Sequence, residues 1–358
     1  MHLLAPSSTM NTKRSWLLWM LHLLISLLFL TSRCQPTSNK TTNIAGDLLA
    51  LLSFKSLITN DPRQALSSWD ANGNSTSTRT PHFCQWTGVS CSGRRYPDRV
   101  TAINLRGFDL AGSISPQLSN LTCLRVLDLS ANNLQGEIPF SIGGCINLQT
   151  MNMSLNFLSG SIPAEVGHLS KLTTFSVRHN NLTGGIPASL SNLTALTLLS
   201  VESNDFHGKI PSWLGNQTSM ETLDLSKNSF DGHVPTALGR MIKLVILNIQ
   251  DNHLQGFMPL NIFNISSIEE LDLGFNNLSG SLPFDIGLKL PKLKYFRIMV
   301  NQFEGPIPAS LSNASELEHL FFRVNNFHGQ IPPDIGSHGH LRIFSLGYNE
   351  LEATESRD

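Results

Sequence analysis

Side chains that could carry out acid–base chemistry recur in this sequence, but they recur at the spacing of a repeat. Asp128, Asp224 and Asp272 each stand four residues before an asparagine of that repeat. Carboxylates act as general acid and base only when they converge on one substrate. Identical carboxylates at one phase of a repeat are instead expected to be surface residues of a consensus. The sequence therefore predicts no catalytic residue at these positions.

Other chemistry-bearing motifs are also missing from the sequence. His338 and His340 are the only close pair among the 12 histidines, and no Cys/His cluster has the spacing of a zinc site. The sequence contains no GxSxG elbow, no Walker A loop, no HExxH helix and no set of kinase motifs. We expect this chain to bind no metal and no cofactor and to catalyse no reaction.

Length and charge exclude further classes of function. The 358 residues include 25 Lys and Arg against 26 Asp and Glu, which leaves a net charge of −1. This balance offers no electrostatic basis for binding nucleic acid or an anionic membrane surface. Hydrophobic residues make up 41% of the chain, which is enough to build a folded core.

The N-terminal segment is typical of a secretory signal peptide. A Lys-Arg pair precedes the apolar run Trp16–Leu30, which is shorter than the ~20 residues that a membrane-spanning helix needs. Small residues follow the run and predict cleavage within Ser32–Gln35, so we assign residues 1–34 to the signal peptide. An uncleaved membrane anchor is the alternative. The mature chain should enter the secretory pathway.

Ten Asn-x-Ser/Thr sequons agree with that route, because such asparagines accept glycans in secreted proteins. The predicted glycosylation sites are Asn39, Asn74, Asn120, Asn152, Asn181, Asn192, Asn216, Asn264, Asn277 and Asn313. Five of the ten share one phase of the repeat. Glycans would also help to keep a chain with only 14% charged residues in solution.

The strongest pattern in the sequence is a repeat of 24 residues. Asparagines recur at this spacing from Asn132 to Asn276, and the series resumes from Asn301 to Asn349 after one extra residue. Apolar residues stand five and three positions before each Asn and two positions after it. A Gly follows four positions after the Asn, and an apolar–Pro pair comes next. Phe108 takes the place of the Asn in a first, atypical repeat.

Each position of the repeat predicts a structural role. Leucines with a period of two indicate a short strand whose leucines point inward. The Asn amide can bond backbone groups inside a buried turn, and the Gly permits a positive φ. The Pro leaves no unpaired N–H on a segment that we expect to be irregular. Because one repeat cannot bury its own apolar face, stacking on neighbours must stabilise it.

This pattern resembles the plant extracellular leucine-rich repeat, LxxLxLxxNxLxGxIPxxLGxLxx. The resemblance implies an α/β repeat solenoid, a right-handed superhelix or horseshoe with a parallel sheet on its concave side and a helical N-terminal cap. We expect about eleven repeats over residues 99–358, the last of them incomplete.

The segment before the repeats resembles the N-terminal cap of plant leucine-rich repeat receptors, and we assign residues 43–98 to it. Its first part is typical of a helix with Asp47 as a plausible N-cap and leucines along one face. Cys84 and Cys91 flank Trp86, and a disulfide between them would fasten the cap over the first repeat. Two free buried thiols are the alternative.

The cysteines within the repeats leave two possibilities. Cys145 takes a phase that leucines hold in other repeats, so we expect it to point into the core as a small apolar side chain. Cys123 is two positions out of that phase. We favour two unpaired thiols over a disulfide.

The concave sheet should expose the residues six, four, two and one positions before each Asn, and these side chains can determine ligand specificity. In later repeats they become aromatic residues, Met and Arg, the types that dominate binding hot spots. The predicted ligand-binding residues are Arg178, His179, Phe275, Tyr295, Arg297, Met299, His319, Phe321, Arg323 and Tyr348. Incidental exposure, or packing against further repeats, is the alternative. A glycan on Asn152 would cover part of the same face.

The resemblance implies a binding function. It is greatest to immune-type plant receptor kinases, a group that includes the rice bacterial-blight resistance receptor. It predicts the extracellular ligand-recognition region of such a receptor, in immune or developmental signalling. The implied partners are a peptide or protein ligand and a co-receptor kinase, with a membrane reached only through a span and a Ser/Thr kinase that this sequence lacks. The location would be the cell surface, or the apoplast if the chain ends at Asp358. The alternatives are a secreted binding protein similar to polygalacturonase inhibitors and a non-functional receptor fragment.

Overall fold

The computed structural model describes residues 40–70, 82–92, 98–335, 337 and 339–352. The predicted signal peptide lies outside these residues, as do two of the sequons, Asn39 and Asn74. Within the described ranges, no helix is both long enough and apolar enough to cross a membrane. The cap and the repeats together form one compact unit.

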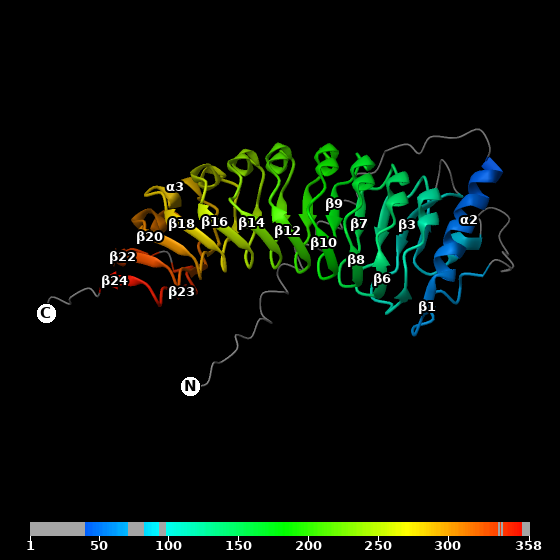
Figure 1. Cartoon of the computed structure of the whole chain (residues 1–358), viewed down its shortest axis with the longest axis horizontal. Helices are drawn as coiled ribbons and strands as arrows, with labels where there is room; N and C mark the ends of the chain where they lie inside the picture. The colour runs from blue at the N-terminus through cyan, green and yellow to red at the C-terminus, as the bar shows by residue number, and fades with distance from the viewer. Residues whose placement is uncertain (1–39, 71–81, 93–97, 336, 338, 353–358) are drawn as a thin grey trace. The chain divides into compact units, whose positions relative to one another are not determined.

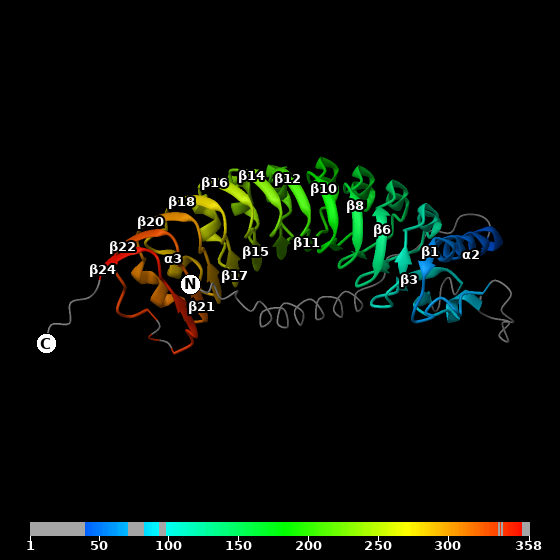
Figure 2. The same cartoon turned by 60° about the horizontal axis from the view of Figure 1, so that its bottom comes forward.

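One sheet of twelve strands collects a strand from every repeat and lines the inner side of the curved array (Figure 2). Its first strand, β2 (Val89–Cys91), comes from the cap and runs antiparallel to β3; all later pairs are parallel. The strands of the repeats are β3 (Val100–Asn104), β5 (Val126–Asp128), β7 (Thr150–Asn152), β9 (Thr174–Ser176), β11 (Leu198–Ser200), β13 (Thr222–Asp224), β15 (Ile246–Asn248), β17 (Glu270–Asp272), β19 (Tyr295–Arg297), β21 (His319–Phe321) and β23 (Ile343–Ser345). This parallel sheet confirms the predicted solenoid fold.

A second sheet of twelve strands follows the asparagine turns of the repeats. It begins with β1 (Ile58–Asn60) of the cap, which is antiparallel to β4, and then continues in parallel. Its other strands are β4 (Ala111–Gly112), β6 (Asn133–Glu137), β8 (Phe157–Gly160), β10 (Asn181–Gly184), β12 (Asp205–Lys209), β14 (Ser229–Gly232), β16 (His253–Phe257), β18 (Asn277–Ser281), β20 (Gln302–Pro306), β22 (Asn326–Gln330) and β24 (Glu350–Glu352). These strands end before the Pro of their repeat, which lies in an irregular link as expected. The strands themselves were not predicted, because they form only when stacking pairs each repeat with its neighbours.

Short helices follow the second-sheet strand in the first nine repeats and line one edge of the array (Figure 1). They are 3₁₀ turns that begin directly after a proline in most repeats: η2 (Pro116–Asn120), η3 (Phe140–Gly144), η4 (Ala164–His168), η5 (Ala188–Asn192), η6 (Ser212–Asn216), η7 (Thr236–Arg240), η8 (Leu260–Asn264) and η9 (Ala309–Asn313). In the eighth repeat an α-helical turn, α3 (Ile286–Lys289), stands in this place. The extra residue of the period lies here, which gives room for the i+4 hydrogen bond from Leu290 to Ile286.

The cap closes the first repeat with a helix and an aromatic cluster. Helix α2 (Lys40–Ser56) buries Phe54 against Trp69, and Trp69 stacks on Trp86 with ring centroids 5.4 Å apart. The cap also contains the short turn η1 (His82–Gln85), and Cys84 and Cys91 form a disulfide.

Asp47 has a different role from the one that we predicted. Helix α2 begins at Lys40, so Asp47 lies within the helix and is not its N-cap. Its buried carboxylate accepts two hydrogen bonds from Arg99, both 2.9 Å, and one from the backbone N–H of Val100. Asp47 therefore joins the helix to the first repeat.

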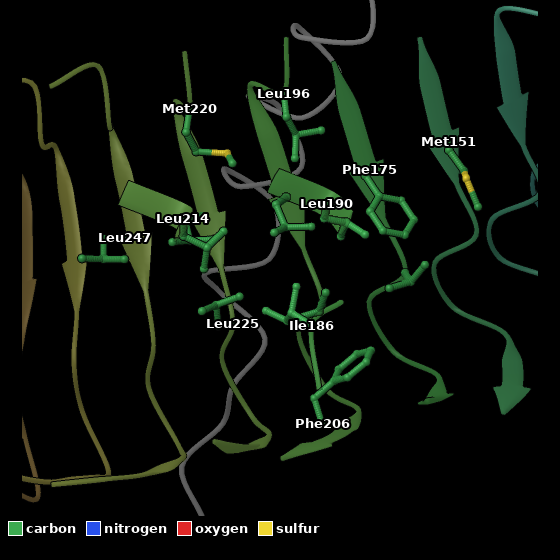
Figure 3. Packing of buried hydrophobic residues seen from close by; sticks show 14 of the residues in the cluster. Met151, Phe175, Ile186, Leu190, Leu196, Phe206, Leu214, Met220, Leu225 and Leu247 are labelled. Carbon is green, nitrogen blue, oxygen red and sulfur yellow. The ribbon is translucent and has the colours of Figure 1, made fainter. Parts of the chain in front are cut away.

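A continuous apolar core runs between the two sheets, built from the inward positions of every repeat (Figure 3). Cys145 lies in this core as a free thiol, as expected, and donates to the carbonyl of Leu118 at 3.2 Å. Burial raises the pKa of Cys145 to about 12. Cys123, by contrast, is disulfide-bonded. The prediction of an unpaired thiol is therefore wrong for Cys123, because its side chain is buried and its sulfur is bonded to another cysteine.

Candidate functional site

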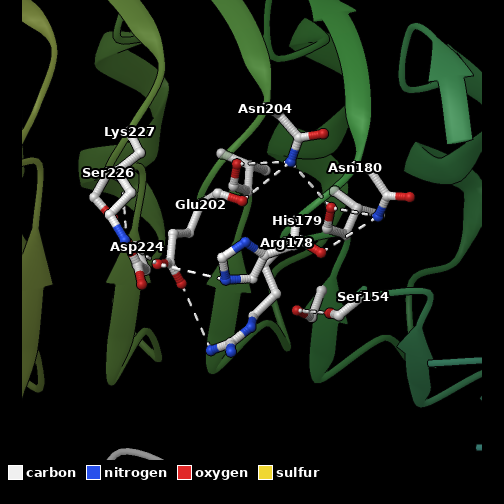
Figure 4. Close-up of polar contacts among 12 residues, drawn as sticks. Ser154, Arg178, His179, Asn180, Glu202, Asn204, Asp224, Ser226 and Lys227 are labelled. Carbon is white, nitrogen blue, oxygen red and sulfur yellow. Dashed lines mark hydrogen bonds and ion pairs between the residues drawn. The ribbon is translucent and has the colours of Figure 1, made fainter. Parts of the chain in front are cut away.

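The turn after each concave strand is held by the repeated asparagine (Figure 4). In Asn204, the side-chain oxygen accepts from the N–H of Leu182 at 3.0 Å. Its amide nitrogen donates to the carbonyls of Val177, Val201 and Glu202 at 3.0, 3.0 and 3.2 Å. One side chain thus bridges two repeats, which confirms the role that we predicted for the Asn and fixes the end of each concave strand.

The residue before each of these asparagines has a left-handed backbone. In the second to eleventh repeats its φ lies between 52° and 59°, although none of these residues is Gly. This conformation is unfavourable for L-residues, but neighbouring repeats hold it in place. The N–H of His179, for example, donates to the carbonyl of Glu202 at 2.8 Å. The predicted site residues His179, Phe275 and Tyr348 all occupy this position, so their directions are set by the turn.

Arg178 and His179 belong to a charged cluster around Glu202 (Figure 4). Glu202 lies 3.5 Å from Arg178, 3.8 Å from His179 and 3.2 Å from Lys227. Glu202 and Lys227 were not among the predicted site residues. Both stand at outward phases of the following repeats, so a comparison of residues one and two periods away would have indicated them.

The same cluster influences a neighbouring carboxyl group. Burial and the nearby Glu202 raise the pKa of Asp224 to about 7, although Ser226 donates to Asp224 through its hydroxyl at 2.6 Å. Burial also lowers the pKa of His179, against the attraction of Glu202. Near neutral pH, therefore, His179 is largely uncharged and Arg178 and Lys227 are the cations that Glu202 neutralises.

A second group of predicted residues, on β19 and β21, forms one connected surface. The rings of Tyr295 and His319 meet edge to face at 4.9 Å, and His319 meets Phe321 at 6.0 Å. The guanidinium of Arg297 lies 5.2 Å from the centre of the Tyr295 ring. Register explains these contacts, because Tyr295 pairs with His319 and Arg297 pairs with Phe321. We call Tyr295, Arg297, His319 and Phe321 the aromatic patch.

Arg297 is not a free cation. It is only 7% exposed and contacts Glu270 at 2.7 Å and Asp272 at 3.2 Å. Burial alone would lower the pKa of Arg297, but the two carboxylates outweigh it and raise that pKa. Burial raises the pKa of Asp272 to about 6 despite the attraction of Arg297. Arg297 therefore positions its neighbours and leaves little charge for a ligand.

The burial of Asp272 also corrects an expectation. Asp128 and Asp272 are both nearly buried and are not the surface residues that we predicted. Asp128 accepts from the N–H and the hydroxyl of Ser130 at 3.0 and 2.6 Å. These carboxylates terminate strands and pair with neighbours on the concave side.

The other predicted ligand residues are more accessible. Phe275, Arg323 and Tyr348 are exposed, and Met299 is half-buried with its sulfur over Gly274. Five strand spacings, roughly 24 Å, separate Arg178 on the turn after β9 from the aromatic patch. The ten residues therefore form two groups, one around Glu202 and one at the C-terminal end of the sheet.

The predicted glycosylation sites within the described residues lie in three different parts of the fold. Five exposed asparagines end the short helices: Asn120, Asn192, Asn216, Asn264 and Asn313. Two exposed ones, Asn181 and Asn277, begin strands of the second sheet. Asn152 differs, because it is buried on the concave sheet. A glycan there remains a prediction, and this burial argues against it.

Comparison with known proteins agrees with this architecture. A leucine-rich repeat region matches residues 104–330, more than half of the chain, and a leucine rich repeat N-terminal domain matches residues 44–92. The chain belongs to the leucine-rich repeat family. The resemblance that the repeat pattern indicated is thereby confirmed.

This leucine-rich repeat chain is similar to plant receptor kinases. It is 46% identical to the receptor kinase-like protein Xa21 of Oryza sativa subsp. japonica over 94 residues, which are 26% of this chain and 8% of that protein. It is 43% identical to the LRR receptor-like serine/threonine-protein kinase EFR of Arabidopsis thaliana over 88 residues, 24% of this chain and 8% of that protein. The matched segments span less than a tenth of either kinase.

Solved structures share the leucine-rich repeat fold over most of the chain. The ectodomain of the Arabidopsis thaliana receptor kinase GASSHO1/SCHENGEN3, in complex with CASPARIAN STRIP INTEGRITY FACTOR 2, has a TM-score of 0.78 and 32% identity, covering 85% of this chain and 36% of that one. A plant ice-binding protein has a TM-score of 0.71 and 27% identity, covering 87% and 99%. The Arabidopsis receptor kinase HAESA, in complex with the peptide hormone IDA and the co-receptor SERK1, has a TM-score of 0.51 and 27% identity, covering 85% and 66%.

Proposed function

We propose that this chain is the extracellular ligand-recognition region of a plant leucine-rich repeat receptor kinase. The observation that carries the proposal is the aromatic patch, because its side chains contact one another and lie on the concave side of a rigid sheet. Aromatic anchors on a preorganised surface lose little entropy on binding. Relatives with this architecture are receptor kinases, and solved ectodomains of this fold hold peptide ligands.

The charges favour a ligand that is largely apolar at this end of the sheet. Glu270 and Asp272 neutralise Arg297, and Glu318 contacts Tyr295 and Arg342. Exposed Arg323 remains as a donor for a polar or acidic group of the ligand. A peptide or a protein segment in extended conformation can follow such a surface from strand to strand.

A display experiment tests this proposal without a known ligand. A library of random peptides on phage is panned against the secreted chain, and the enriched peptides are measured against a Tyr295→Ala/Phe321→Ala/Arg323→Ala variant. We expect at least a tenfold loss of affinity, since three anchors are removed. The matched control is Val126→Ala/Thr222→Ala, two half-buried residues on the concave strands of the second and sixth repeats. Peptides that bind both variants as tightly as the parent chain would refute the proposed surface.

The remaining assignments follow from this function and are proposals too. Residues 1–34 would be the signal peptide, 43–98 the cap and 99–358 the repeats. The chain would act by binding and leave catalysis to a kinase elsewhere in a longer protein at the plasma membrane. A leucine-rich repeat co-receptor kinase would join the liganded complex, as SERK1 does in the HAESA structure.

A secreted binding protein is the second candidate function. It is favoured by the plant ice-binding protein, a solved leucine-rich repeat chain that this fold covers over 99% of its length. Sequencing of the native transcript beyond the codon for Asp358 separates the two candidates. A frame that continues into an apolar span and a kinase supports the receptor, and a stop codon in an abundant transcript supports the secreted protein.

A further inference from the structure

Two valines on the turns after the concave strands have an unfavourable backbone conformation. Val300 and Val324 have φ angles of 55° and 56°, in the left-handed region. A residue that branches at Cβ is an outlier in this region, whereas Asn, Asp and Gly adopt it at much lower cost. Backbone strain of this kind clusters at functional sites, because a residue chosen for folding alone would avoid it.

The fold itself does not require valine in these turns. The same turn occurs with the same φ in other repeats, where Ala131 and Ser203 are among the residues that occupy it. Backbone hydrogen bonds to the next repeat hold the turn, as when the N–H of Val300 donates to the carbonyl of Arg323 at 3.0 Å. Val300 is half-buried but does not pack against the continuous core, and Val324 is 37% exposed. The two valines therefore carry strain without stabilising the core.

The valines belong to a continuous row of apolar and aromatic side chains. Phe275 precedes them by one repeat and Tyr348 follows them by one, at the same turn position. These turns lie side by side, because the N–H of Phe275 donates to the carbonyl of Met299 at 2.8 Å and the N–H of Val324 donates to that of Gly347 at 2.9 Å. In the second to seventh repeats the position is held by Ala131, Leu155, His179, Ser203, Lys227 and Asp251. We call the last four, Phe275, Val300, Val324 and Tyr348, the turn row.

The turn row lies next to the aromatic patch. Val300 and Val324 each stand three residues after a member of that patch, Arg297 and Phe321. Three strand spacings of ~4.8 Å make the row about 14 Å long, which four or five residues of an extended peptide span at ~3.3 Å per residue. The row contains no charged side chain, so it favours apolar side chains in a partner.

We infer that the turn row is a second wall of the ligand surface, and that it binds apolar side chains of one extended peptide that also contacts the aromatic patch. Val300 and Val324 are then residues that determine specificity. Their χ1 angles are restricted before the ligand arrives, so they lose little entropy on binding. This inference rests on the proposed ligand-recognition function.

Replacement of the valines by Asn separates binding from folding. Val300→Asn/Val324→Asn relieves the strain, because Asn tolerates a left-handed backbone, and it removes both apolar side chains. The probes are the phage peptides that lose affinity for the Tyr295→Ala/Phe321→Ala/Arg323→Ala variant. We expect the thermal unfolding midpoint to rise by about 2–4 °C while the affinity for these peptides falls at least tenfold. Valines that served the fold would instead give a lower midpoint.

The matched control is Leu155→Asn, at the same turn position of the third repeat. There φ is 57°, and the replaced side chain is again apolar and half-buried. This variant should keep or raise the midpoint and bind the peptides as the parent chain does. None of the three substitutions creates a sequon.

Two results would overturn the inference alone. They are an affinity of Val300→Asn/Val324→Asn within twofold of the parent, and a midpoint below that of the parent. A dimer of the parent chain in sedimentation that the same variant abolishes would assign the row to a second copy of the chain, and would also overturn it. If every enriched peptide binds the Tyr295→Ala/Phe321→Ala/Arg323→Ala variant as tightly as the parent, the proposed function fails and the inference fails with it.

Discussion

Asp47 and Arg99 are 52 residues apart in sequence, yet two hydrogen bonds of 2.9 Å join their side chains. Asp47 is fully buried within helix α2, and Arg99 precedes the first strand of the repeats. Burial raises the pKa of Asp47 even though Arg99 and the N–H of Val100 favour its charged form. The pair connects the cap to the solenoid, so it couples the folding of the two parts.

Removal of Asp47 should be strongly destabilising. Asp47→Ala leaves the guanidinium of Arg99 buried without its carboxylate, which costs about 3–5 kcal/mol in unfolding free energy. Urea unfolding monitored by tryptophan fluorescence measures the change, since Trp69 and Trp86 lie in the cap. The control is Asp109→Ala, which breaks an ion pair with Arg63 whose side chains are 47% and 58% exposed. That loss should be below about 1 kcal/mol, and similar losses for both variants would contradict the coupling role of Asp47.

The repeated asparagines, which bond the backbone of two neighbouring repeats, predict a second large effect on stability. Asn228 accepts from the N–H of Phe206 and donates to the carbonyls of Val201, Leu225 and Ser226. Asn228→Ala should cost roughly 2–4 kcal/mol, because several buried backbone groups lose their partner. Exposed Asn133, with a single 3.3 Å contact to a carbonyl, is the control. Chemical denaturation of both alanine variants decides the point, and an unchanged midpoint for Asn228→Ala would show that the backbone groups find other partners.

The cysteines should differ in reactivity. Cys145 is a buried free thiol with its pKa raised to about 12, so alkylation of the native chain at pH 8 should leave it unmodified. Denaturant alone should expose it, whereas Cys84 and Cys91 should need a reductant as well, because they form a disulfide. Peptide mass spectrometry with iodoacetamide follows each site. Labelling of Cys84 or Cys91 in the denatured, unreduced chain would contradict their disulfide.

Asp272 should make stability depend on pH. Its pKa is about 6 in the folded chain, against about 4 when unfolded, so between these values the folded state holds a proton that the unfolded state has released. Unfolding free energy should therefore fall as pH rises from 4 to 6, by roughly 3 kcal/mol at most. Asp272→Asn removes this contribution and should flatten the slope. Parallel slopes for the two proteins in urea titrations at several pH values would show that Asp272 does not carry the effect.

The repeat is recognisable in the sequence because the same packing and hydrogen-bonding requirements recur every 24 residues. The leucines of the concave strands, the asparagine of the turn and the free thiol of Cys145 each follow from a phase of the period. Each residue at such a phase has partners of known type one period away, so periodicity alone determines its surroundings. The solenoid, the parallel concave sheet and the role of Asn204 were predictable for this reason.

Where the repeats differ in sequence, the surroundings of a side chain depend on which residues the stacking places beside it. Only the tertiary structure determines those surroundings. Glu202 neutralises Arg178 from the next repeat, and Glu270 and Asp272 do the same to Arg297 from the previous one. The repeat position of each of these residues is visible in the sequence. Side-chain rotamers and burial, however, determine which charges are neutralised by a neighbour.

Contacts between segments far apart in the chain could not be predicted from the sequence either. The bond between Asp47 and Arg99 and the pairing of the second sheet both join segments that no local pattern relates. Local chemistry determined the repeating unit of this protein. The contacts between units, which set the charge and shape of its surfaces, arose only when the repeats and the cap were stacked.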